Sequence, residues 1–297
     1  MKIISDSEIM GLDISPATCV EWVRESLLIK DKCQLPHKIP VHPRGTDFIT
    51  TMPCLLPTEY GSFGVKVVSR TEGRKPALRS SLTMYDTESG EVAALMDSNW
   101  ITDMRTGAMA ALAIVTLQKS DASVYAFMGL GHIARATMLC LASVAADRHI
   151  TVRLLRYKDQ AEKFADEFGG FSHISFEIAD DVASLISGAD VLVSAITDAK
   201  ALIVEDADMF APGMLLVPVH TRGFQNCDTV FDKIFGDDYA HISGFKYFNQ
   251  FRSFNEIGDV LAGKAKGREN DSQRIIAYNY GLALHDVYFA YKILEML

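Results

Sequence analysis

The sequence predicts an α/β fold that contains a doubly wound parallel sheet, and three observations carry this prediction. The chain has 297 residues, of which 48% are hydrophobic and 23% charged, an ordinary globular composition with room for about two domains. From residue 123 onward, short apolar runs alternate with helical patterns, as in a parallel sheet that helices cover on both faces. Residues 129–134, after the first of these runs, have the spacing G-x-G-x-x-A, which is typical of a dinucleotide-binding turn.

The first hundred residues predict a mixed region of one helix and several paired strands. A helical pattern lies near residues 15–30, and five prolines between residues 36 and 57 exclude long helices there. Apolar and polar residues alternate in three later segments, of which the last two flank a plausible hairpin turn at Thr87–Gly90. These predicted strands are 63–69, 80–86 and 92–97. At Thr102 the period becomes helical, with Thr102 or Asp103 as the expected N-cap.

The region after residue 123 predicts strands and helices in turn. The expected strands are 124–128, 150–155, 174–178, 191–195 and 214–219. One helix is expected to end near residue 145, and two others are expected at 160–168 and 180–187. From Asp271 and Ser272 a capped helical pattern runs almost to the end of the chain, and we expect no strand after Phe254. This final helix is predicted to pack on the first domain.

The glycine turn has a specific mechanical explanation. Gly129 permits a tight turn, Gly131 lets a pyrophosphate approach the backbone, and Ala134 lets the following helix pack close to the strand. The N-terminus of that helix supplies N–H donors and a positive dipole end to the phosphates. Because the motif follows a strand, opens a helix and is succeeded by a second strand, we interpret it as a nicotinamide dinucleotide site.

The loop after the second strand indicates which dinucleotide is bound. An NAD site usually places an acid there, whereas an NADP site offers arginine; this chain has Arg156 and Lys158 before the first acid, Asp159. NADP(H) is therefore favoured and NAD(H) stays possible, the alternative being that both cations belong to a solvated loop. The candidate cofactor-binding residues are Thr106, Gly129, Gly131, His132, Ile133, Ala134, Arg156, Lys158 and Thr197.

Three cations in the first domain are candidates for binding a substrate carboxylate: Arg44, Lys66 and Arg105. Lys66 lies within the apolar strand pattern 64–68, where it either faces solvent or lines a pocket. Arg105 is expected in the first turn of a helix, where the dipole disfavours a cation unless an anion is nearby. Together these side chains could bind an amino-acid or keto-acid carboxylate, the arginines bidentately.

Composition excludes several other classes of function. The net charge is -9 and no basic patch is visible, so we expect no nucleic acid partner. The five cysteines are widely spread and indicate reduced thiols, and the histidines form no metal-binding motif. Polar residues interrupt the N-terminal stretch before any signal peptide could form, and the longest weakly polar run, 108–117, is about half of a membrane span. We therefore expect a soluble, cytoplasmic protein.

At this point the sequence resembles the ornithine cyclodeaminase/μ-crystallin family. The resemblance rests on segments that occur in order along nearly the whole chain: Arg44, Thr51–Pro53, Gly64–Val68, Leu82–Asp86 with Gly90, Thr102–Ala108, the glycine turn, Gly267–Arg268, and Gly281 with Asp286. It implies a Rossmann-type NAD(P) domain at 119–271 inserted in an α+β domain at 1–118 plus 272–297. The α+β domain would bind substrate and form a homodimer.

The resemblance also implies roles for particular residues. Arg44, Lys66 and Arg105 would hold the substrate carboxylate, and Lys66 would also act on the carbonyl or imine. Where cyclodeaminases carry an aspartate after a strand, this chain has His220, which can still perform acid–base chemistry. His220 is therefore the second catalytic candidate.

Three functions stay open at this stage. The first is an NAD(P)-dependent oxidoreductase that transfers hydride to or from the α-carbon of a small amino, imino or keto acid. The second is a true ornithine cyclodeaminase, which converts ornithine to proline and ammonia without net use of cofactor. The third is a binding protein of μ-crystallin type that holds NADPH and a small ligand without turnover.

Overall fold

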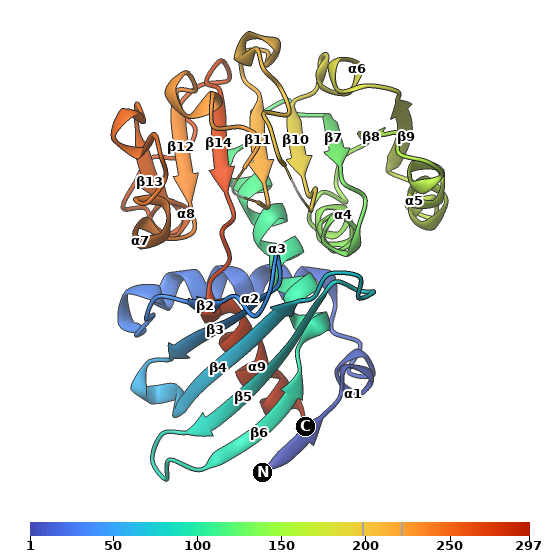
Figure 1. Ribbon diagram of the computed structural model, residues 1–297. Helices are drawn as coiled ribbons and strands as arrows, with labels where there is room; N and C mark the ends of the chain where they lie inside the picture. The colour runs from blue at the N-terminus through green and yellow to red at the C-terminus, as the bar shows by residue number, and fades with distance from the viewer. Residues whose placement is uncertain (198, 221) are drawn as a thin grey trace. The chain divides into compact units, whose positions relative to one another are not determined.

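A computed structural model describes residues 1–197, 199–220 and 222–297, and the chain divides into two compact units (Figure 1). Unit 1 is Met1–Arg105 with Gly281–Leu297, and unit 2 is the continuous segment Thr106–Tyr280 between them. The sequence placed the divisions at 118/119 and 271/272. The observed divisions differ from the predicted ones because helix α3 (Asn99–Leu117) runs through the first observed boundary and strand β14 (Ile275–Tyr278) belongs to unit 2.

Unit 1 contains a six-stranded sheet with the strand order β1-β6-β5-β4-β3-β2. Its neighbouring strands are antiparallel, except that β1 runs parallel to β6. The strands are β1 (Lys2–Ile4), β2 (Ile39–Val41), β3 (Phe48–Leu55), β4 (Ser62–Arg70), β5 (Leu78–Asp86) and β6 (Val92–Asp97). The predicted strands 63–69, 80–86 and 92–97 are confirmed as β4, β5 and β6.

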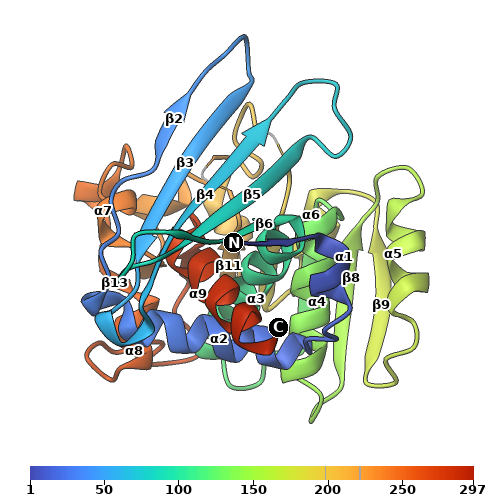
Figure 2. The same ribbon diagram turned by 90° about the horizontal axis from the view of Figure 1, so that it is seen from below.

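Helices cover one face of this sheet (Figure 2). The C-terminal helix α9 (Ala283–Met296) packs across β3, β4 and β5, and α2 (Pro16–Ile29) packs against α9. The Ser15 side chain accepts the N–H of Thr18 and caps α2, with Pro16 at its first position. A short helix, α1 (Asp6–Met10), follows β1. The packing of α9 brings residues from the end of the chain onto the buried face of β4.

Unit 2 contains an eight-stranded parallel sheet with the order β13-β12-β14-β11-β10-β7-β8-β9. Its strands are β7 (Val124–Met128), β8 (Ile150–Leu155), β9 (Ile174–Ala179), β10 (Val191–Ser194), β11 (Leu215–Pro218), β12 (Lys233–Gly236), β13 (Phe254–Glu256) and β14. Its further helices are α4 (His132–Val144), α5 (Gln160–Phe168), α6 (Val182–Ile186), α7 (Tyr239–Ile242) and α8 (Ile257–Leu261). This is the predicted doubly wound architecture.

The strand order reverses direction between β7 and β10. After β7 the chain adds β8 and β9 on one side, and then crosses to add β10 and β11 on the other. In open α/β sheets, ligands bind outside the carboxyl ends of the strands at such a reversal. The glycine turn after β7 lies at this position.

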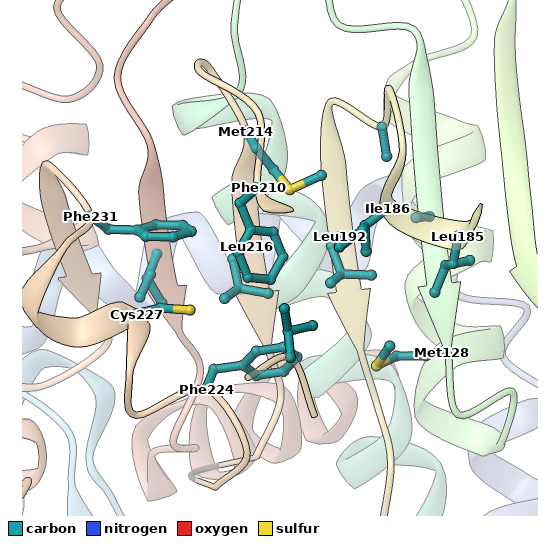
Figure 3. Close-up of a cluster of buried hydrophobic side chains, with 14 of the residues drawn as sticks. Met128, Leu185, Ile186, Leu192, Phe210, Met214, Leu216, Phe224, Cys227 and Phe231 are labelled. Carbon is teal, nitrogen blue, oxygen red and sulfur yellow. The ribbon is translucent and has the colours of Figure 1, made fainter. Parts of the chain in front are cut away.

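The strands of unit 2 are continuous apolar runs in the sequence because their side chains lie in the core of the unit. Buried side chains from the strands pack against phenylalanines of the loops around β11 and β12 (Figure 3). Phe210 and Phe231 meet edge to face with ring centroids 5.5 Å apart. Each such side chain stabilises the fold by about 1.5–3 kcal/mol relative to exposure.

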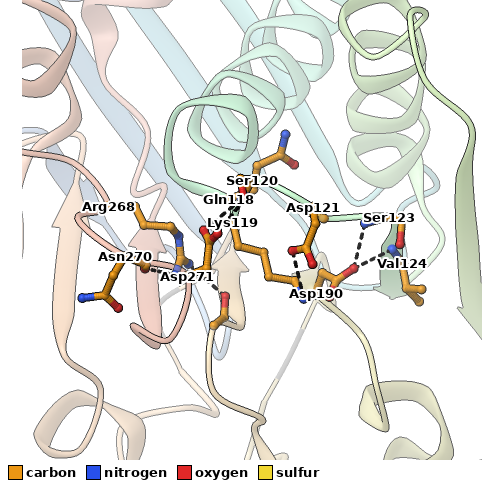
Figure 4. A network of polar contacts seen from close by, with 12 residues as sticks. Gln118, Lys119, Ser120, Asp121, Ser123, Val124, Asp190, Arg268, Asn270 and Asp271 are labelled. Carbon is orange, nitrogen blue, oxygen red and sulfur yellow. Dashed lines mark hydrogen bonds and ion pairs between the residues drawn. The ribbon is translucent and has the colours of Figure 1, made fainter.

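A polar network ties the beginning of β7 to the loop before β14 (Figure 4). Asp190 accepts the backbone N–H groups of Ser123 and Val124 at 2.7 and 2.9 Å and pairs with Lys119 at 2.7 Å. The side chain of Arg268 donates to the carbonyl oxygens of Leu117 and Gly213. Arg268, one of the residues that carry the resemblance, therefore connects the end of α3 to the sheet.

The predicted continuous helix from residue 271 is wrong, and so is the expectation of no strand after Phe254. Residues 275–278 form β14, which lies between β11 and β12, and the helix begins only at Ala283. The four residues of β14 are all buried, and a fully apolar run of this length fits a helical period as well as a strand. Gly281, with φ +89°, separates the two elements.

Helix α3 begins at Asn99, three residues before the predicted Thr102. The Thr102 backbone N–H already donates to the Ser98 carbonyl. Arg105 consequently lies in the second turn of the helix and not in the first. Among the described residues, every helix is too short or too polar to cross a membrane.

Candidate active site

Lys66 and Arg105 meet at one buried carboxylate in unit 1. The Lys66 Nζ donates to Asp286 Oδ1 at 2.7 Å, and the Arg105 Nε donates to the same oxygen at 3.1 Å. The side chains of Lys66, Arg105 and Asp286 are 1%, 8% and 0% exposed, respectively. Two cations and one anion leave this cluster with a net charge of about +1 when all three groups are ionised.

Strand alternation explains why Lys66 is buried. Gly64 and Lys66 lie on the face of β4 that α9 covers, while Val65 and Val67 point to the other face. A Cβ at Gly64 would lie 2.5 Å from the side chain of Val287, so this strand must carry glycine for α9 to approach. Lys66 is buried against Asp286, so the solvent-facing alternative is wrong.

The local structure also favours Asp286 and Arg105 at their positions. Asp286 lies in the first turn of α9, where the helix dipole stabilises an anion. Gly281 has φ +89°, and a Cβ there would lie 2.8 Å from a terminal nitrogen of Arg105. Glycine therefore permits both the turn before α9 and the close approach of the guanidinium group.

Burial and charge determine the protonation of the cluster. Burial lowers the pKa of Lys66 to about 8, although the neighbouring Asp286 opposes this shift. Burial alone would raise the pKa of Asp286, but the charges of Arg105 and Lys66 and the hydrogen bond from Lys66 hold it below its ordinary value. The carboxylate is therefore ionised, and Lys66 can exchange a proton near neutral pH.

A neutral histidine lies next to this carboxylate in the chain. The His285 Nδ1 and the Ser26 hydroxyl are 2.8 Å apart, and both residues are fully buried. Burial, followed by the charge of Arg105, lowers the pKa of His285 to about 3. His285 is uncharged at neutral pH and adds no charge to the cluster.

Arg44 is not a partner of Asp286. Its side chain is 76% exposed and pairs with Asp47 at 2.8 Å. Asp47 in turn accepts the backbone N–H of Glu72 at 2.6 Å, which fixes the carboxylate that holds Arg44. The structure therefore brings together two of the three predicted cations.

The glycine turn in unit 2 has the geometry that the motif predicts. Gly129 has φ +78°, and a Cβ there would lie 2.6 Å from the backbone of Ala195. Gly131 is the N-cap of α4, and a Cβ there would meet nothing within 4 Å. Ala134 is fully buried. The backbone beside Gly131 is thus open to a ligand, and the N-terminus of α4 is directed to bind an anion.

His220 lies at the same edge of the sheet, just after β11. Its Nε2 is 2.6 Å from the hydroxyl oxygen of Ser194, the last residue of β10. Burial lowers the pKa of His220, and the backbone of Arg222 opposes this as a hydrogen-bonding partner. Thr197, the other candidate beyond β10, is exposed.

Asn279 is a polar residue at this edge that the sequence did not single out. Its backbone N–H donates to Pro218 at the end of β11, and the residue is 6% exposed. Neither atom of its carboxamide has a hydrogen-bond partner within the described part of the chain. Buried amides without partners are rare in proteins, so Asn279 is suited to hydrogen bond with a ligand.

Of the two cations after β8, Arg156 is partly neutralised by carboxylates. Arg156 donates to Asp180 at 2.6 Å and also pairs with Glu162, while the Lys158 ammonium lies over the ring of Tyr157. Both cations are exposed. Exposed ion pairs contribute about 0–1 kcal/mol each, so a phosphate group could still compete for Arg156.

The sequence analysis missed the role of Asp286, the Ser194–His220 contact and the carboxylates beside Arg156. Only Asp286 had a detectable signal, because it is a charged residue in the first, mostly apolar part of a helical pattern. No group of three metal-binding side chains occurs within the ranges that the structure describes. The five cysteines, all among these residues, are free thiols.

Comparisons with known proteins identify the family of the chain. The chain matches the ornithine cyclodeaminase/mu-crystallin family over residues 2–297. It is 29% identical over 265 residues to the nodulation efficiency protein NfeD of Rhizobium meliloti, covering 85% of this chain and 81% of that protein. It is 26% identical over 314 residues to the alanine dehydrogenase of Archaeoglobus fulgidus, covering 99% of this chain and 94% of that protein.

Two solved structures share the fold. One is the Δ1-pyrroline-2-carboxylate reductase of Thermococcus litoralis in complex with NADH and L-proline, with a TM-score of 0.88 and 23% identity over 100% of this chain and 98% of that one. The other is an archaeal alanine dehydrogenase dimer with bound NAD, with a TM-score of 0.85 and 24% identity over 99% of this chain and 95% of that one.

Proposed function

The chain belongs to the ornithine cyclodeaminase/mu-crystallin family, and from this premise we propose that it is an NAD(P)-dependent oxidoreductase. It transfers hydride to or from the α-carbon of a small amino, imino or keto acid. The observation that carries the proposal is the buried Lys66–Asp286–Arg105 cluster. The reductase, dehydrogenase and cyclodeaminase activities named among its relatives all use amino or imino acids.

Lys66 and Arg105 are the residues we assign to the substrate carboxylate. The net charge of about +1 on the cluster matches one carboxylate, and charge-assisted hydrogen bonds to buried cations are among the strongest in proteins. Asp286 pairs with both buried cations and orients them. We place Arg44 in this role only if its exposed guanidinium leaves Asp47 when substrate binds.

Lys66 is also suited to move a proton. Its lowered pKa of about 8 lies close to neutral pH, where a general acid works best. At Nζ it can hold the proton that a carbonyl oxygen or imine nitrogen needs as the α-carbon is reduced. His220 is the second residue proposed for proton transfer.

The residues of unit 2 fit a nicotinamide dinucleotide. The open space at Gly131 and the N-terminus of α4 suit the pyrophosphate, and the unpartnered carboxamide of Asn279 suits a polar group of the cofactor. Thr106, His132, Ile133 and Thr197 are further candidates for contacts with the cofactor. A bound nicotinamide supplies or accepts the hydride, while the protein binds and orients it.

We propose NADP(H) as the preferred cofactor, with NAD(H) as the alternative. Arg156 and Lys158 follow β8, where the ribose phosphate of NADP is usually recognised. Asp180 and Glu162 compete for Arg156, which weakens this preference. The cofactor found in the two solved structures is NADH or NAD.

We further propose a homodimer that forms through the sheet of unit 1. The face of β4 opposite α9 carries Val65 and Val67, and strands β3 and β6 add Ile49 and Leu95 on the same face, which are 37% and 41% exposed. An apolar sheet face of this kind usually marks a protein interface. A cytoplasmic location, where thiols stay reduced, suits the five free cysteines.

The test is turnover by the purified protein with NADPH or NADH and a panel of imino acids and keto acids with amines. We expect reduced cofactor to be consumed in step with product. Release of ammonia from ornithine without net oxidation of cofactor would instead identify a cyclodeaminase. Tight cofactor binding without any turnover would identify a binding protein.

A further inference from the structure

An antiparallel bridge in unit 1 brings Cys33 and Cys54 together. Gln34 and Leu55, the residues that follow the two cysteines, exchange two backbone hydrogen bonds of 3.0 Å. Because side chains alternate along extended backbone, both cysteines point to the side opposite Gln34 and Leu55. A side-chain hydrogen bond joins their thiols. The two sulfur atoms are therefore neighbours, and both are free thiols.

The two thiols differ in exposure. Cys33 follows a short 3₁₀ helix, η1 (Lys30–Lys32), and is partly exposed. Its sulfur lies 3.4 Å from the carbonyl oxygen of Ile29, which fixes the direction of the side chain. Cys54 lies in β3 and is fully buried. A small oxidant from solvent therefore reaches Cys33 first, and Cys54 lies behind it as a second thiol.

The hydrogen bond between the thiols also makes them unequal in acidity. It lowers the pKa of Cys33, although burial and the charge of Glu59 oppose this shift. The same hydrogen bond, followed by burial, raises the pKa of Cys54. Because the thiolate is the form that attacks an oxidant, Cys33 is suited to react first while Cys54 keeps its proton.

We propose that Cys33 and Cys54 are a redox-active pair that a hydroperoxide converts into an intramolecular disulfide. The Cys33 thiolate attacks the terminal oxygen of the hydroperoxide, so that an S–O bond forms and the O–O bond breaks. Cys33 becomes a sulfenic acid, and the leaving oxygen takes a proton from solvent to give an alcohol or water. The Cys54 sulfur then attacks the Cys33 sulfur, the S–O bond breaks, and hydroxide leaves as water with the proton of Cys54.

The disulfide would form on the strand beside the candidate active site. In β3, Cys54 lies on the same buried face as Met52, which pairs with Lys66 of β4. A bond from Cys54 to Cys33 closes a loop over residues 34–53 and restricts its motion. Disulfides in reducing compartments are usually transient and redox-sensing, which agrees with two thiols that are free at rest. This inference concerns thiol chemistry and does not depend on the proposed function.

The test uses the full chain, reduced and then freed of reductant. A small excess of hydrogen peroxide is added at about pH 7, remaining thiols are blocked with a maleimide, and unreduced peptides are identified by mass spectrometry. We expect a Cys33–Cys54 linked pair that dithiothreitol cleaves. Unreacted thiols, a Cys33 sulfinic or sulfonic acid beside a reduced Cys54, or a link between Cys33 residues of two copies would each overturn the proposal.

The order of the two steps is tested separately. In the wild type, iodoacetamide should alkylate Cys33 at least about ten-fold faster than Cys54 at neutral pH. In Cys54→Ser the second thiol is missing, so the Cys33 sulfenic acid should accumulate and be trapped by dimedone. In Cys33→Ser the buried Cys54 should stay reduced under the same peroxide. Equal alkylation rates in the wild type would contradict Cys33 as the first thiol to react.

Cys19→Ser is the matched control, because it removes another buried thiol of unit 1, one whose pKa burial raises to about 12. This variant should form the Cys33–Cys54 link as fast as the wild type. Loss of the link in Cys19→Ser would contradict a reaction confined to the pair. If the link forms and no imino or keto acid is turned over, the proposed function fails and the redox pair stands.

Discussion

At the scale of single residues, the proposal gives Lys66 both a binding and a proton-transfer role. Its ammonium is buried against one carboxylate that also holds Arg105, and burial brings its pKa to about 8. The charged form, which binds a carboxylate, therefore predominates below about pH 8 and is lost as the pH rises through that value. We therefore expect Lys66 to limit the proposed reaction at alkaline pH.

The Lys66→Ala variant should lose at least about 100-fold in kcat/KM, since it removes both the charge and the proton donor. Because it leaves Asp286 less well paired, Lys66→Ala with Asp286→Asn is the companion that removes the unpaired buried charge. Cofactor affinity, measured by fluorescence titration, should stay within a few-fold. Full turnover in either variant would exclude Lys66 from the mechanism.

The pH profile provides a second test of Lys66. In the wild type, kcat/KM should fall as the pH rises through about 8. In Lys66→Arg this limb should be absent up to pH 10, because the arginine pKa is above 12. An unchanged alkaline limb in Lys66→Arg would assign it to another group.

We propose that Arg156 sets the cofactor selectivity. Asp180→Asn and Glu162→Gln remove its competing carboxylates, so each should strengthen NADPH binding a few-fold with little effect on NADH. Arg156→Ala should weaken NADPH binding about ten-fold, the loss expected for one charge-assisted contact. The control is Lys163→Ala, which breaks the exposed pair with Asp159 and should change neither affinity. Equal affinities of the wild type for NADPH and NADH would refute the NADP(H) preference.

At the scale of elements, Gly131 at the start of α4 and Gly107 in α3 allow cofactor binding and stability to be tested separately. Gly131 has open space where a side chain would begin, whereas a Cβ at Gly107 of α3 would lie 2.4 Å from the backbone of Ala136 in α4. Gly131→Ala should weaken cofactor binding about ten-fold or more and keep the melting temperature nearly unchanged. Gly107→Ala should instead destabilise the protein by about 1–3 kcal/mol through overpacking.

Thermal melts and cofactor titrations of both variants check this contrast. Equal losses of stability would mean that the space beside Gly131 is needed for folding. Unchanged cofactor affinity in Gly131→Ala would mean that no ligand approaches this part of the backbone.

The strands of unit 2 from β7 to β11 were predictable from the sequence, and the reason is physical, whereas β12 and β13 were not predicted. Strands buried on both faces are short apolar runs between turn residues, and β7 and β8 were predicted with the observed bounds. β14 was missed because its four apolar residues are followed closely by the apolar pattern of α9, so that both fit one helical period. Only sheet pairing with β11 and β12 distinguishes the strand.

The candidate site was less predictable, because its contacts join distant parts of the chain. The sequence indicated Lys66 and Arg105, but their common partner Asp286 is 220 and 181 residues away. The ion pair of Arg44 with Asp47 spans only three residues, and it keeps that cation out of the buried cluster. Local patterns thus identified the charged groups and could not identify which of them meet.

At the scale of the whole molecule, we propose that unit 1 binds the substrate anion and unit 2 the dinucleotide, and we expect two copies to associate. Val67→Asp would place a charge on the apolar face of the unit 1 sheet, so it should shift a dimer towards monomer. Met209→Asp, at a 43% exposed position in unit 2, is the control and should keep the dimer. Light scattering after size exclusion measures the mass, and a monomeric wild type would refute the predicted interface.

The most direct test of the account is the consumption of reduced nicotinamide cofactor by the wild-type protein and by Lys66→Ala with Asp286→Asn, measured over the panel of imino and keto acids. The account predicts stoichiometric oxidation of the cofactor by the wild type with at least one substrate of this class. It also predicts near-complete loss of that reaction in the double variant, with cofactor affinity retained. Equal turnover by both proteins, or cofactor binding with no turnover in the wild type, would contradict it.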